Sequence, residues 1–323
     1  MRVVIAYSDQ RPGADTDLHA AVNRLQMTLQ QLGHPVTAVP LGLDVPKFQM
    51  ELRDAQPELI WNLCEEACGL PRRELHAAAL LELLDVPVTG TGAVDLALCL
   101  DKSRVRHVLA GEGVRVPAAV RVAHAHELPA KIPLPALVKP ACQDGSTGIH
   151  ADSLVHDVRT AHDRVERLLR ADLGPVLVEQ FVAGREINVL MLGPHGGPLH
   201  ALAYGEIDFS ALPQDAPQIL TWEAKWEEES PVFLQTPVNY PAVIEPQLQQ
   251  QIATIAHRAF RTLGLEGYAR LDLRVDAEGV AYVIDVNPNP DLSPGAGLDR
   301  ALPTLGLQFA DFVALQLQWA RVK

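Results

Sequence analysis

Two alternating runs near the C-terminus constrain the fold more than any other feature of this chain. Residues 267–275 and 280–287 flank a turn-forming Asp-Ala-Glu-Gly sequence at 276–279, which predicts a β-hairpin. Side chains alternate between the two faces of a strand, so one face is apolar and the other is polar. The apolar face comprises Leu271, Leu273 and Val275, with Tyr282, Ile284 and Val286 on the return strand. The polar face comprises Arg270, Asp272, Asp285 and Asn287.

The register of this hairpin decides how close its polar side chains lie. If Val275 pairs with Val280, Arg270 lies opposite Asp285, and Asp272 lies diagonal to Asp285 within roughly 8 Å. Carboxylates this close repel each other unless a cation lies between them, and their hard oxygen atoms suit Mg²⁺. The alternative is a solvated surface hairpin in which Arg270 and Asp285 form an ordinary ion pair.

Composition excludes several classes of protein. The 323 residues are 48% hydrophobic, which is enough for two or three packed domains. The net charge is −13 and there is no Lys/Arg run, so we expect no nucleic-acid partner. No signal peptide and no apolar run of about 20 residues is visible, which predicts a cytoplasmic protein with no membrane segment. The scattered cysteines are expected to be reduced; they are Cys64, Cys68, Cys99 and Cys142.

The N-terminal part alternates strands and helices. Strands are predicted at 2–7, 36–39, 58–63 and 86–88, and helices from Asp15 or Thr16 to Gly33, at 74–84 and at 93–110. The first helix would bury Leu18, Val22, Leu25, Leu29 and Leu32. This order predicts a doubly wound α/β domain that ends near residue 97. The first strand is not followed by G-x-G-x-x-G, so no dinucleotide fingerprint is present.

The middle of the chain carries a pattern suited to phosphate. A strand at 136–140 ends in Lys139 and is followed by a loop with Gly145, Ser146 and Gly148. Glycines let backbone N–H groups turn toward an anion, while the hydroxyl and the lysine add polar contacts. An ordinary hairpin loop is the alternative.

Downstream segments add carboxylates and a long connection. Two strands joined at Gly184 carry Glu179 and Glu186, which either bind a flat polar ligand beside Phe181 and Val182 or point to solvent. The irregular segment 205–240, with Lys225 in it, resembles a lid. Further helices are predicted at 155–170, 245–263 and 307–321.

Taken in order, these segments resemble the ATP-grasp superfamily, and most closely the D-alanine–D-alanine ligases. The matching blocks are TGTG at 89–92 with LDK at 100–102, VKPACQDGSTGI at 138–149, LVEQFVAGREINV at 177–189, WEAKW at 222–226, and GYARLDLRVD at 267–276 with YVIDVNPNP at 282–290. The resemblance implies an ATP-grasp architecture. The N-terminal α/β domain, 1–97, would precede two α+β subdomains, 98–187 and 188–323, that clasp ATP.

The resemblance also implies roles for single residues. The nucleotide-binding set would be Lys102, Lys139, Ser146, Glu179, Phe181, Val182, Glu186 and Lys225. Within it the lysines would contact phosphates, Glu179 would face adenine with backbone from Phe181 and Val182, and Glu186 would hold the ribose. The metal set for Mg²⁺, with Mn²⁺ as an alternative, would be Asp272, Asp285 and Asn287. The catalytic set would be Arg270, Ser146 and Lys225.

The implied chemistry joins a carboxylate to an amine at the expense of ATP, through an acyl phosphate, and leaves a peptide or amide bond. Its partners would be small amino-acid, carboxylate and amine substrates, and a homodimer would be the assembly by analogy. The alternatives are an ATP-grasp phosphotransferase, an ATP-binding module without chemistry, and a hydrolase that uses only the hairpin carboxylates.

Departures from the ligase pattern lie at the substrate end. The loop at 9–17 lacks the expected glutamate, Asn62–Gly69 replaces a His-Gly loop, and Trp226 stands where a tyrosine is usual. The turn after Asn287 is longer, and Asp285 occupies the place of a glutamate. These differences leave the substrates' identity open.

Overall fold

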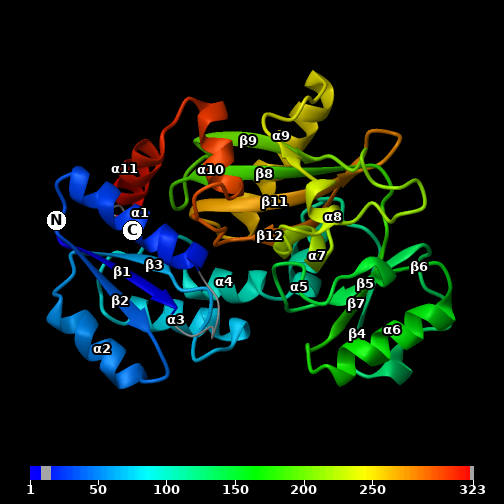
Figure 1. Cartoon of the computed structure of the whole chain (residues 1–323), viewed down its shortest axis with the longest axis horizontal. Helices are drawn as coiled ribbons and strands as arrows, with labels where there is room; N and C mark the ends of the chain where they lie inside the picture. The colour runs from blue at the N-terminus through cyan, green and yellow to red at the C-terminus, as the bar shows by residue number, and fades with distance from the viewer. Residues whose placement is uncertain (9–15, 321–323) are drawn as a thin grey trace.

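The computed structural model describes residues 1–8 and 16–320 and divides their strands among three sheets (Figure 1). The strands are β1 (Val3–Ser8), β2 (Val36–Leu41), β3 (Leu59–Leu63), β4 (Ala119–Val122), β5 (Ala136–Pro140), β6 (Leu154–Val155), β7 (Val176–Gln180), β8 (Arg185–Gly193), β9 (Ala201–Ile207), β10 (Val238–Asn239), β11 (Gly267–Val275) and β12 (Ala281–Asn287). The α-helices are α1 (Thr16–Gln31), α2 (Val45–Asp54), α3 (Glu74–Glu82), α4 (Ala93–Cys99), α5 (Lys102–Gly111), α6 (Val158–Arg170), α7 (Trp222–Trp226), α8 (Pro231–Leu234), α9 (Pro246–Thr262), α10 (Gly297–Ala301) and α11 (Phe309–Ala320).

The N-terminal sheet is parallel, in the order β2-β1-β3, and is covered on both faces. Val3 and Ile5 pack into a core with α1 and α11, whereas Val4 and Ala6 pack with α2 and α3. A strand buried on both faces reads as a continuous apolar run, which is the pattern of β1. The predicted doubly wound domain is therefore confirmed.

Details of this domain differ from the sequence-based expectation. Helix α2 was not predicted, and the expected strand at 86–88 contributes a single parallel bridge between Ile60 and Val88. Leu32 follows the end of α1 and is 39% exposed, so it does not belong to the buried face predicted for that helix.

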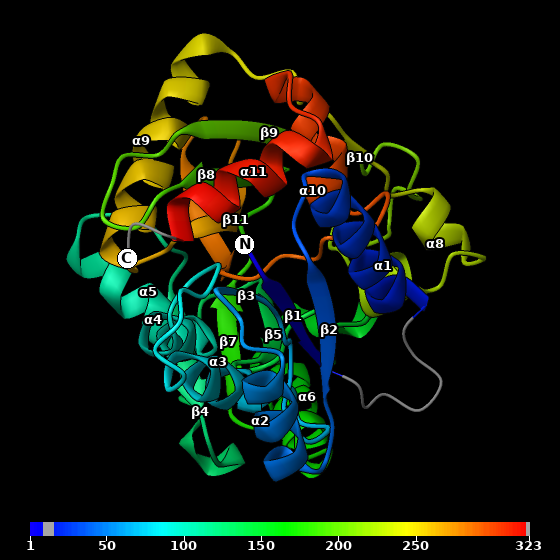
Figure 2. The ribbon, with the colours of Figure 1, turned by 90° about the vertical axis from the view of Figure 1, so that its left-hand side faces the viewer.

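The largest sheet is antiparallel, in the order β10-β9-β8-β11-β12, and lies between two cores. Along β8, Val189 and Met191 face a core formed with α5 and α9, while Leu190 and Leu192 face the core shared with α1 and α11. Figure 2 shows α11 crossing this sheet on the side of α1. The N-terminal and C-terminal parts therefore share one hydrophobic core.

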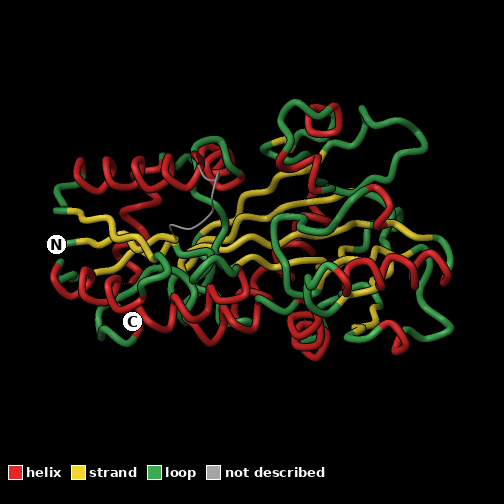
Figure 3. Tube along the Cα trace, turned by 60° about the horizontal axis from the view of Figure 1, so that its bottom comes forward, coloured by secondary structure: helices red, strands yellow, loops and turns green. Residues whose placement is uncertain are grey.

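The remaining sheet has the order β4-β7-β5-β6 and packs one face against α6. This amphipathic helix begins at the N-cap Asp157, whose carboxylate accepts from the Thr160 amide. Figure 3 shows strands running through the middle of the molecule with helices outside them. The architecture is that predicted, while the domain boundaries at 97 and 187 stay predictions.

The helix predicted at 93–110 is interrupted. Helix α4 ends at Cys99, and Asp101 begins α5 as an N-cap whose carboxylate accepts from the Ser103 amide at 2.9 Å. An aspartate that can bond to its own backbone competes with helix continuation. The break puts Lys102 at the first position of a new helix.

The register of the hairpin differs from that expected. Val275 pairs with Ala281, because Asp276 pairs with Val280 and closes the turn through its carboxylate. A bulge then shifts the pairing between Asp272 and Leu273 by one more residue. Arg270 consequently faces Asn287, and Asp272 lies directly opposite Asp285 rather than diagonal to it.

The bulge also changes the faces of β12. Val283 and Val286 both enter the core, whereas Ile284 lines the same cavity as Asp285. The expectation that Ile284 shares the apolar face with Val286 is therefore wrong. An extra residue in one strand reverses the alternation of the side chains beyond it.

Gly184 links β7 to β8 and provides a stability test. Its φ of +133° is open essentially to glycine alone, and a Cβ there would collide with the carbonyl oxygen of Val275. We expect Gly184→Ala to lower the free energy of unfolding by about 2–4 kcal/mol, from strain plus overpacking. Chemical denaturation followed by circular dichroism measures this loss.

The matched control is Gly174→Ala. Gly174 has a φ of +82° and open space where a Cβ would lie, so this substitution should lower the free energy of unfolding by only about 1–2 kcal/mol. Equal losses in the two variants would contradict the steric argument.

Candidate active site

Predicted site residues that lie far apart in the sequence, from Lys102 to Asp285, meet around one narrow cavity of about 110 Å³. Its walls include the predicted residues Lys102, Lys139, Ser146, Glu179, Phe181, Val182, Glu186, Lys225, Arg270, Asp272 and Asp285. Asn287 does not line it and instead borders an adjoining cavity of about 930 Å³. Arg270 and Lys225 line both cavities, so the two spaces meet at these cations.

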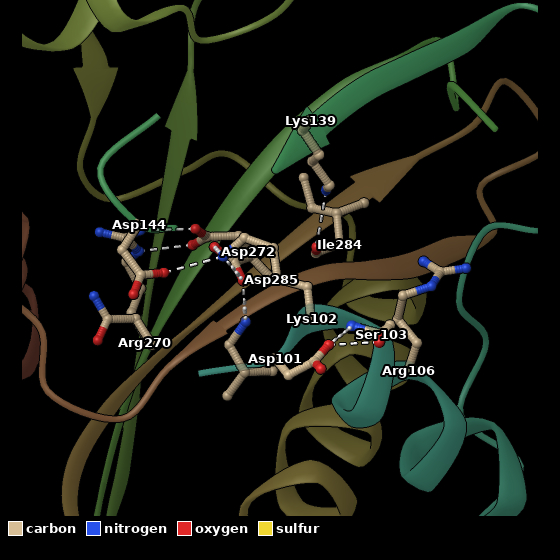
Figure 4. Close-up of polar contacts among 12 residues, drawn as sticks. Asp101, Lys102, Ser103, Arg106, Lys139, Asp144, Arg270, Asp272, Ile284 and Asp285 are labelled. Atoms are coloured by element: carbon tan, nitrogen blue, oxygen red, sulfur yellow. Dashed lines mark hydrogen bonds and ion pairs between the residues drawn. The ribbon is translucent and has the colours of Figure 1, made fainter. Parts of the chain in front are cut away.

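Lys102 links the start of α5 to the hairpin. Its Nζ donates to both oxygens of Asp285, at 2.9 and 3.0 Å, and to Asp144 at 3.0 Å (Figure 4). Burial alone would raise the pKa of Asp285, but the charges of Lys102 and Lys139 outweigh it and hold that pKa below its usual value. Asp285 is therefore an anion at neutral pH.

Arg270 and Asp272 form a second ion pair, on neighbouring positions of the same face of β11. The guanidinium donates two parallel bonds to the carboxylate, each 2.8 Å long, and Asn188 adds a third at 2.7 Å. Burial lowers the pKa of Arg270, but Asp272, together with the charges of Asp285 and Tyr240, raises it above its usual value, so the arginine remains a cation. Bidentate pairs of this kind fix the orientation of both planes.

Glu179 is 2% exposed and lies between two cations. One oxygen accepts from Lys139 Nζ at 2.9 Å and the other accepts from Arg106 at 2.5 Å. Lys139 also donates to the carbonyl of Ile284, at 3.4 Å, which ties β5 to the bulged strand (Figure 4). A carboxylate in this position is held by charge from both sides and does not point to solvent.

Glu186 occupies the other side of the cavity. It accepts from Arg274 at 2.9 Å, and burial still raises the pKa of Glu186 despite that positive charge. Arg274 also donates to the Val182 carbonyl at 2.9 Å and lies 4.8 Å from the centre of the Phe181 ring. The solvated alternative for Glu186 is therefore excluded too.

The glycine loop and the predicted lid are in contact. Ser146 donates its hydroxyl to the Leu220 carbonyl at 2.9 Å, and the indole of Trp226 donates to the Gly145 carbonyl at 2.7 Å. Between them, Lys225 extends into the cavity, where burial lowers the pKa of its ammonium, with Arg270 adding to the effect. The segment at 205–240 contains β10, α7 and α8, and therefore has more regular structure than its sequence suggested.

Arg106 and Arg274 are site residues that the sequence reasoning missed, although both carried a signal. Arg106 lies one helical turn beyond Lys102, and residues four apart share a helix face. Arg274 continues the even-numbered face of β11 that holds Arg270 and Asp272. Each pairs with a carboxylate that was named, Glu179 or Glu186.

The donor set on the hairpin fits a magnesium ion. Asp272 and Asp285 are direct cross-strand partners, so their Cβ atoms lie about 4.5–5.5 Å apart. The described residues contain no group of three or more histidine, cysteine, aspartate or glutamate side chains suited to a metal. A pair of carboxylates with an amide oxygen is what Mg²⁺ uses when phosphates and water complete its coordination.

The sequence profile described as "D-ala D-ala ligase C-terminus" matches residues 117–318, which is more than half of the chain. This chain belongs to the D-alanine–D-alanine ligase family. It is an ATP-dependent ligase of that type, as predicted. The phosphotransferase, non-catalytic and hydrolase alternatives are thereby set aside.

Individual relatives agree with this assignment. The chain is 30% identical to a D-alanine–D-alanine ligase from Gluconobacter oxydans over 311 residues, covering 94% of this chain and 93% of the relative. Its fold resembles the Bacillus anthracis D-alanine–D-alanine ligase crystallised with ATP, with a TM-score of 0.76, 17% identity and coverage of 100% and 98%. The D-Ala:D-Ser ligase VanG from Enterococcus faecalis gives a TM-score of 0.74 at 16% identity, covering 99% and 100%.

All four cysteines are free thiols, as expected. In the described part of the chain, none of the helices has the length and apolar character needed to cross a membrane. Most of the loop that lacks the family glutamate, residues 9–15, lies outside the described residues. The replaced His-Gly loop lies near the wide cavity, which Glu65 lines.

Proposed function

We propose that this ligase joins the carboxylate of one amino acid to the amine of a second substrate through an acyl phosphate, with Mg²⁺ at the hairpin carboxylates. The observation that supports it most is the meeting of Lys102, Lys139 and Lys225 with Asp272 and Asp285 at one cavity. Three cations beside two oxygen anions suit a polyphosphate with its metal ion. The substrates' identity is the part that family membership leaves open.

The nucleotide roles follow from the cavity walls. Lys102 and Lys139 would move from carboxylate partners to phosphate oxygens, with Ser146 and the glycine loop alongside. Glu179, Phe181 and Val182 would border the adenine, and Glu186 the ribose. In the structure the backbone amide of Phe181 donates to the carbonyl of Pro135, and the carbonyl of Val182 accepts from Arg274. A hydrogen bond from either backbone group to adenine would replace one of these protein contacts.

Asp272, Asp285 and Asn287 would hold the metal ion, which would supply positive charge against the phosphoryl group that is transferred. Mn²⁺ has the same ligand preference and is the alternative ion. Asp285 is shorter than the usual glutamate, and its position directly opposite Asp272 brings the two carboxylates together at one point of the hairpin. Asn287 would complete the set from the side of the wide cavity.

Arg270 and the lid would act on the second half of the reaction. When the amine attacks the acyl carbon, negative charge develops on the carbonyl oxygen. Arg270 borders both cavities and would stabilise that oxygen. Lys225 and Trp226, held over the glycine loop, would keep water from the acyl phosphate.

A screen of amino-acid pairs tests this proposal. We expect the purified protein to release ADP and phosphate in equal amounts only when ATP, Mg²⁺ and a productive pair are present, and mass spectrometry should find the condensed product. Chelation of the metal with EDTA should stop turnover, and added Mg²⁺ should restore it. If no carboxylate and amine pair gave a product, the ligase proposal would be abandoned. A homodimer and a cytoplasmic location are further parts of the proposal, which light scattering and cell fractionation test.

A further inference from the structure

The wide cavity of about 930 Å³ beside the active site is lined by one buried acidic residue, which comes from the N-terminal part of the chain. Glu74 is the first residue of α3, is only 7% exposed and borders the same cavity as Arg270 and Asn287. Four other carboxylates line this cavity, and each is less buried than Glu74: Asp17, Glu65, Asp144 and Asp291. Glu74 is therefore the carboxylate there that would pair most strongly with a cation, because water screens it least.

One oxygen of Glu74 is held in place and the other is not. Oε1 accepts from the Asn289 side chain at 3.0 Å, and Asn289 is itself oriented by the Tyr268 hydroxyl at 3.2 Å. The backbone N–H of Asn289 donates to Oδ1 of Asn287 at 2.8 Å, so Asn289 connects Glu74 to the end of the hairpin. The second oxygen of Glu74 accepts no hydrogen bond from the described residues.

We propose that Glu74 binds the ammonium group of the amino acid whose carboxylate is activated. This inference rests on the proposed ligase reaction. An α-amino acid brings a carboxylate, which must lie beside the phosphates and Arg270, and an ammonium group, which needs an anionic acceptor across the same cavity. Glu74 supplies that acceptor from α3, through the oxygen that accepts no hydrogen bond from the described residues.

The electrostatics of the site support the assignment. The pKa of Glu74 is raised to about 8, mainly by burial, with the hydrogen bond from Asn289 opposing the rise and the charges of Asp144 and Glu65 adding to it. A carboxylate under these conditions gains most from an arriving cation, since the cation offsets the unfavourable burial of its charge. The wide cavity has a volume of about 930 Å³, which admits an amino acid whose side chain is larger than a methyl group.

The test compares Glu74→Gln with the unaltered enzyme. We expect KM for the activated amino acid to rise about 10–100-fold, the value of one charged hydrogen bond, with KM for ATP unchanged. The first ligand is D-alanine, or the amino acid that the screen selects. The comparison ligand is its analogue in which hydrogen replaces the amino group. Titration calorimetry should show that loss of the amino group weakens binding to the unaltered enzyme far more than to the variant.

Glu82→Gln is the matched control on the same helix. Glu82 accepts from the Ala93 amide at 2.7 Å and does not line the wide cavity, so its replacement should leave both KM values unchanged. A merely structural role for Glu74 predicts a lower Tm, whereas the ammonium role predicts that Glu74→Gln keeps or raises Tm at pH 8, because a buried charge is removed.

Two results separate this inference from the ligase proposal. Turnover with an unchanged amino-acid KM in Glu74→Gln would overturn the role of Glu74 and leave the ligase intact. Binding that depends on Glu74 without any product would support Glu74 and count against the ligase. Absence of amino-acid binding to the unaltered enzyme would overturn the role of Glu74 as well.

Discussion

Replacing Arg270 with alanine is expected to lower kcat by about 10²–10³-fold, the usual effect of removing one donor to a developing oxyanion. Affinity for ATP should be unchanged, because the variant leaves the lysines and the carboxylates of the nucleotide cavity in place. Asp272 would lose its bidentate partner but keep the hydrogen bond from Asn188. Steady-state kinetics measures the first effect, and titration with ATP and Mg²⁺ measures the second.

Two further variants make this prediction specific. Arg270→Lys keeps a charge but loses the planar bidentate geometry, so it should recover only part of the rate. Arg258→Ala removes an exposed guanidinium on α9 that donates to the Glu112 carbonyl, and should leave kcat unchanged. If Arg270→Ala weakened ATP binding as much as it slowed turnover, its role would be to hold the nucleotide, and the oxyanion role would be rejected.

The second large effect is on stability. Glu179→Gln should lower the free energy of unfolding by about 3–5 kcal/mol, because it leaves Lys139 and Arg106 buried without their anion. Denaturant titration measures the loss. The double variant Glu179→Gln/Lys139→Met removes one of the two unpaired cations and should recover part of the stability. Together with the single variant Lys139→Met it gives the coupling between the pair.

A more exposed ion pair on α6, the helix that packs on the sheet containing Glu179, provides the control. Glu166 accepts from Arg170 one turn further along α6, and the side chains of Arg170 and Glu166 are 76% and 36% exposed, far more than that of Glu179. Glu166→Gln should change stability by no more than about 0.5 kcal/mol. A loss for Glu179→Gln as small as this would show that water reaches the buried cluster, contrary to its low exposure.

Much of the fold could be predicted because its signals are local. The continuous apolar run of β1 and the alternation in β11 each reflect a period that neighbouring residues establish by themselves. The same alternation placed Arg270 and Asp272 on one face, and the structure keeps them there. The interruption of the helix at Asp101 was missed because a cap depends on one hydrogen bond and not on a period.

The site could be predicted as a set of residues but not as a set of pairs. Lys102 was expected beside phosphate, and its carboxylate partner Asp285 lies 183 positions away. Glu74, 215 positions from Asn289, carried no motif at all. Contacts over such distances depend on how three sheets pack, which no short pattern encodes.

The sequence by itself determined the order of most strands and helices, most of the apolar faces that form the cores, and which residues carry charge. Only the tertiary structure decided that Asp272 faces Asp285, because a closed turn and a bulge each move the register by one residue. It also brought Glu74 to the cavity of Arg270, since the shared core joins the two ends of the chain. Periodicity is a property of neighbours along the chain, whereas register and cavity walls depend on packing between distant segments.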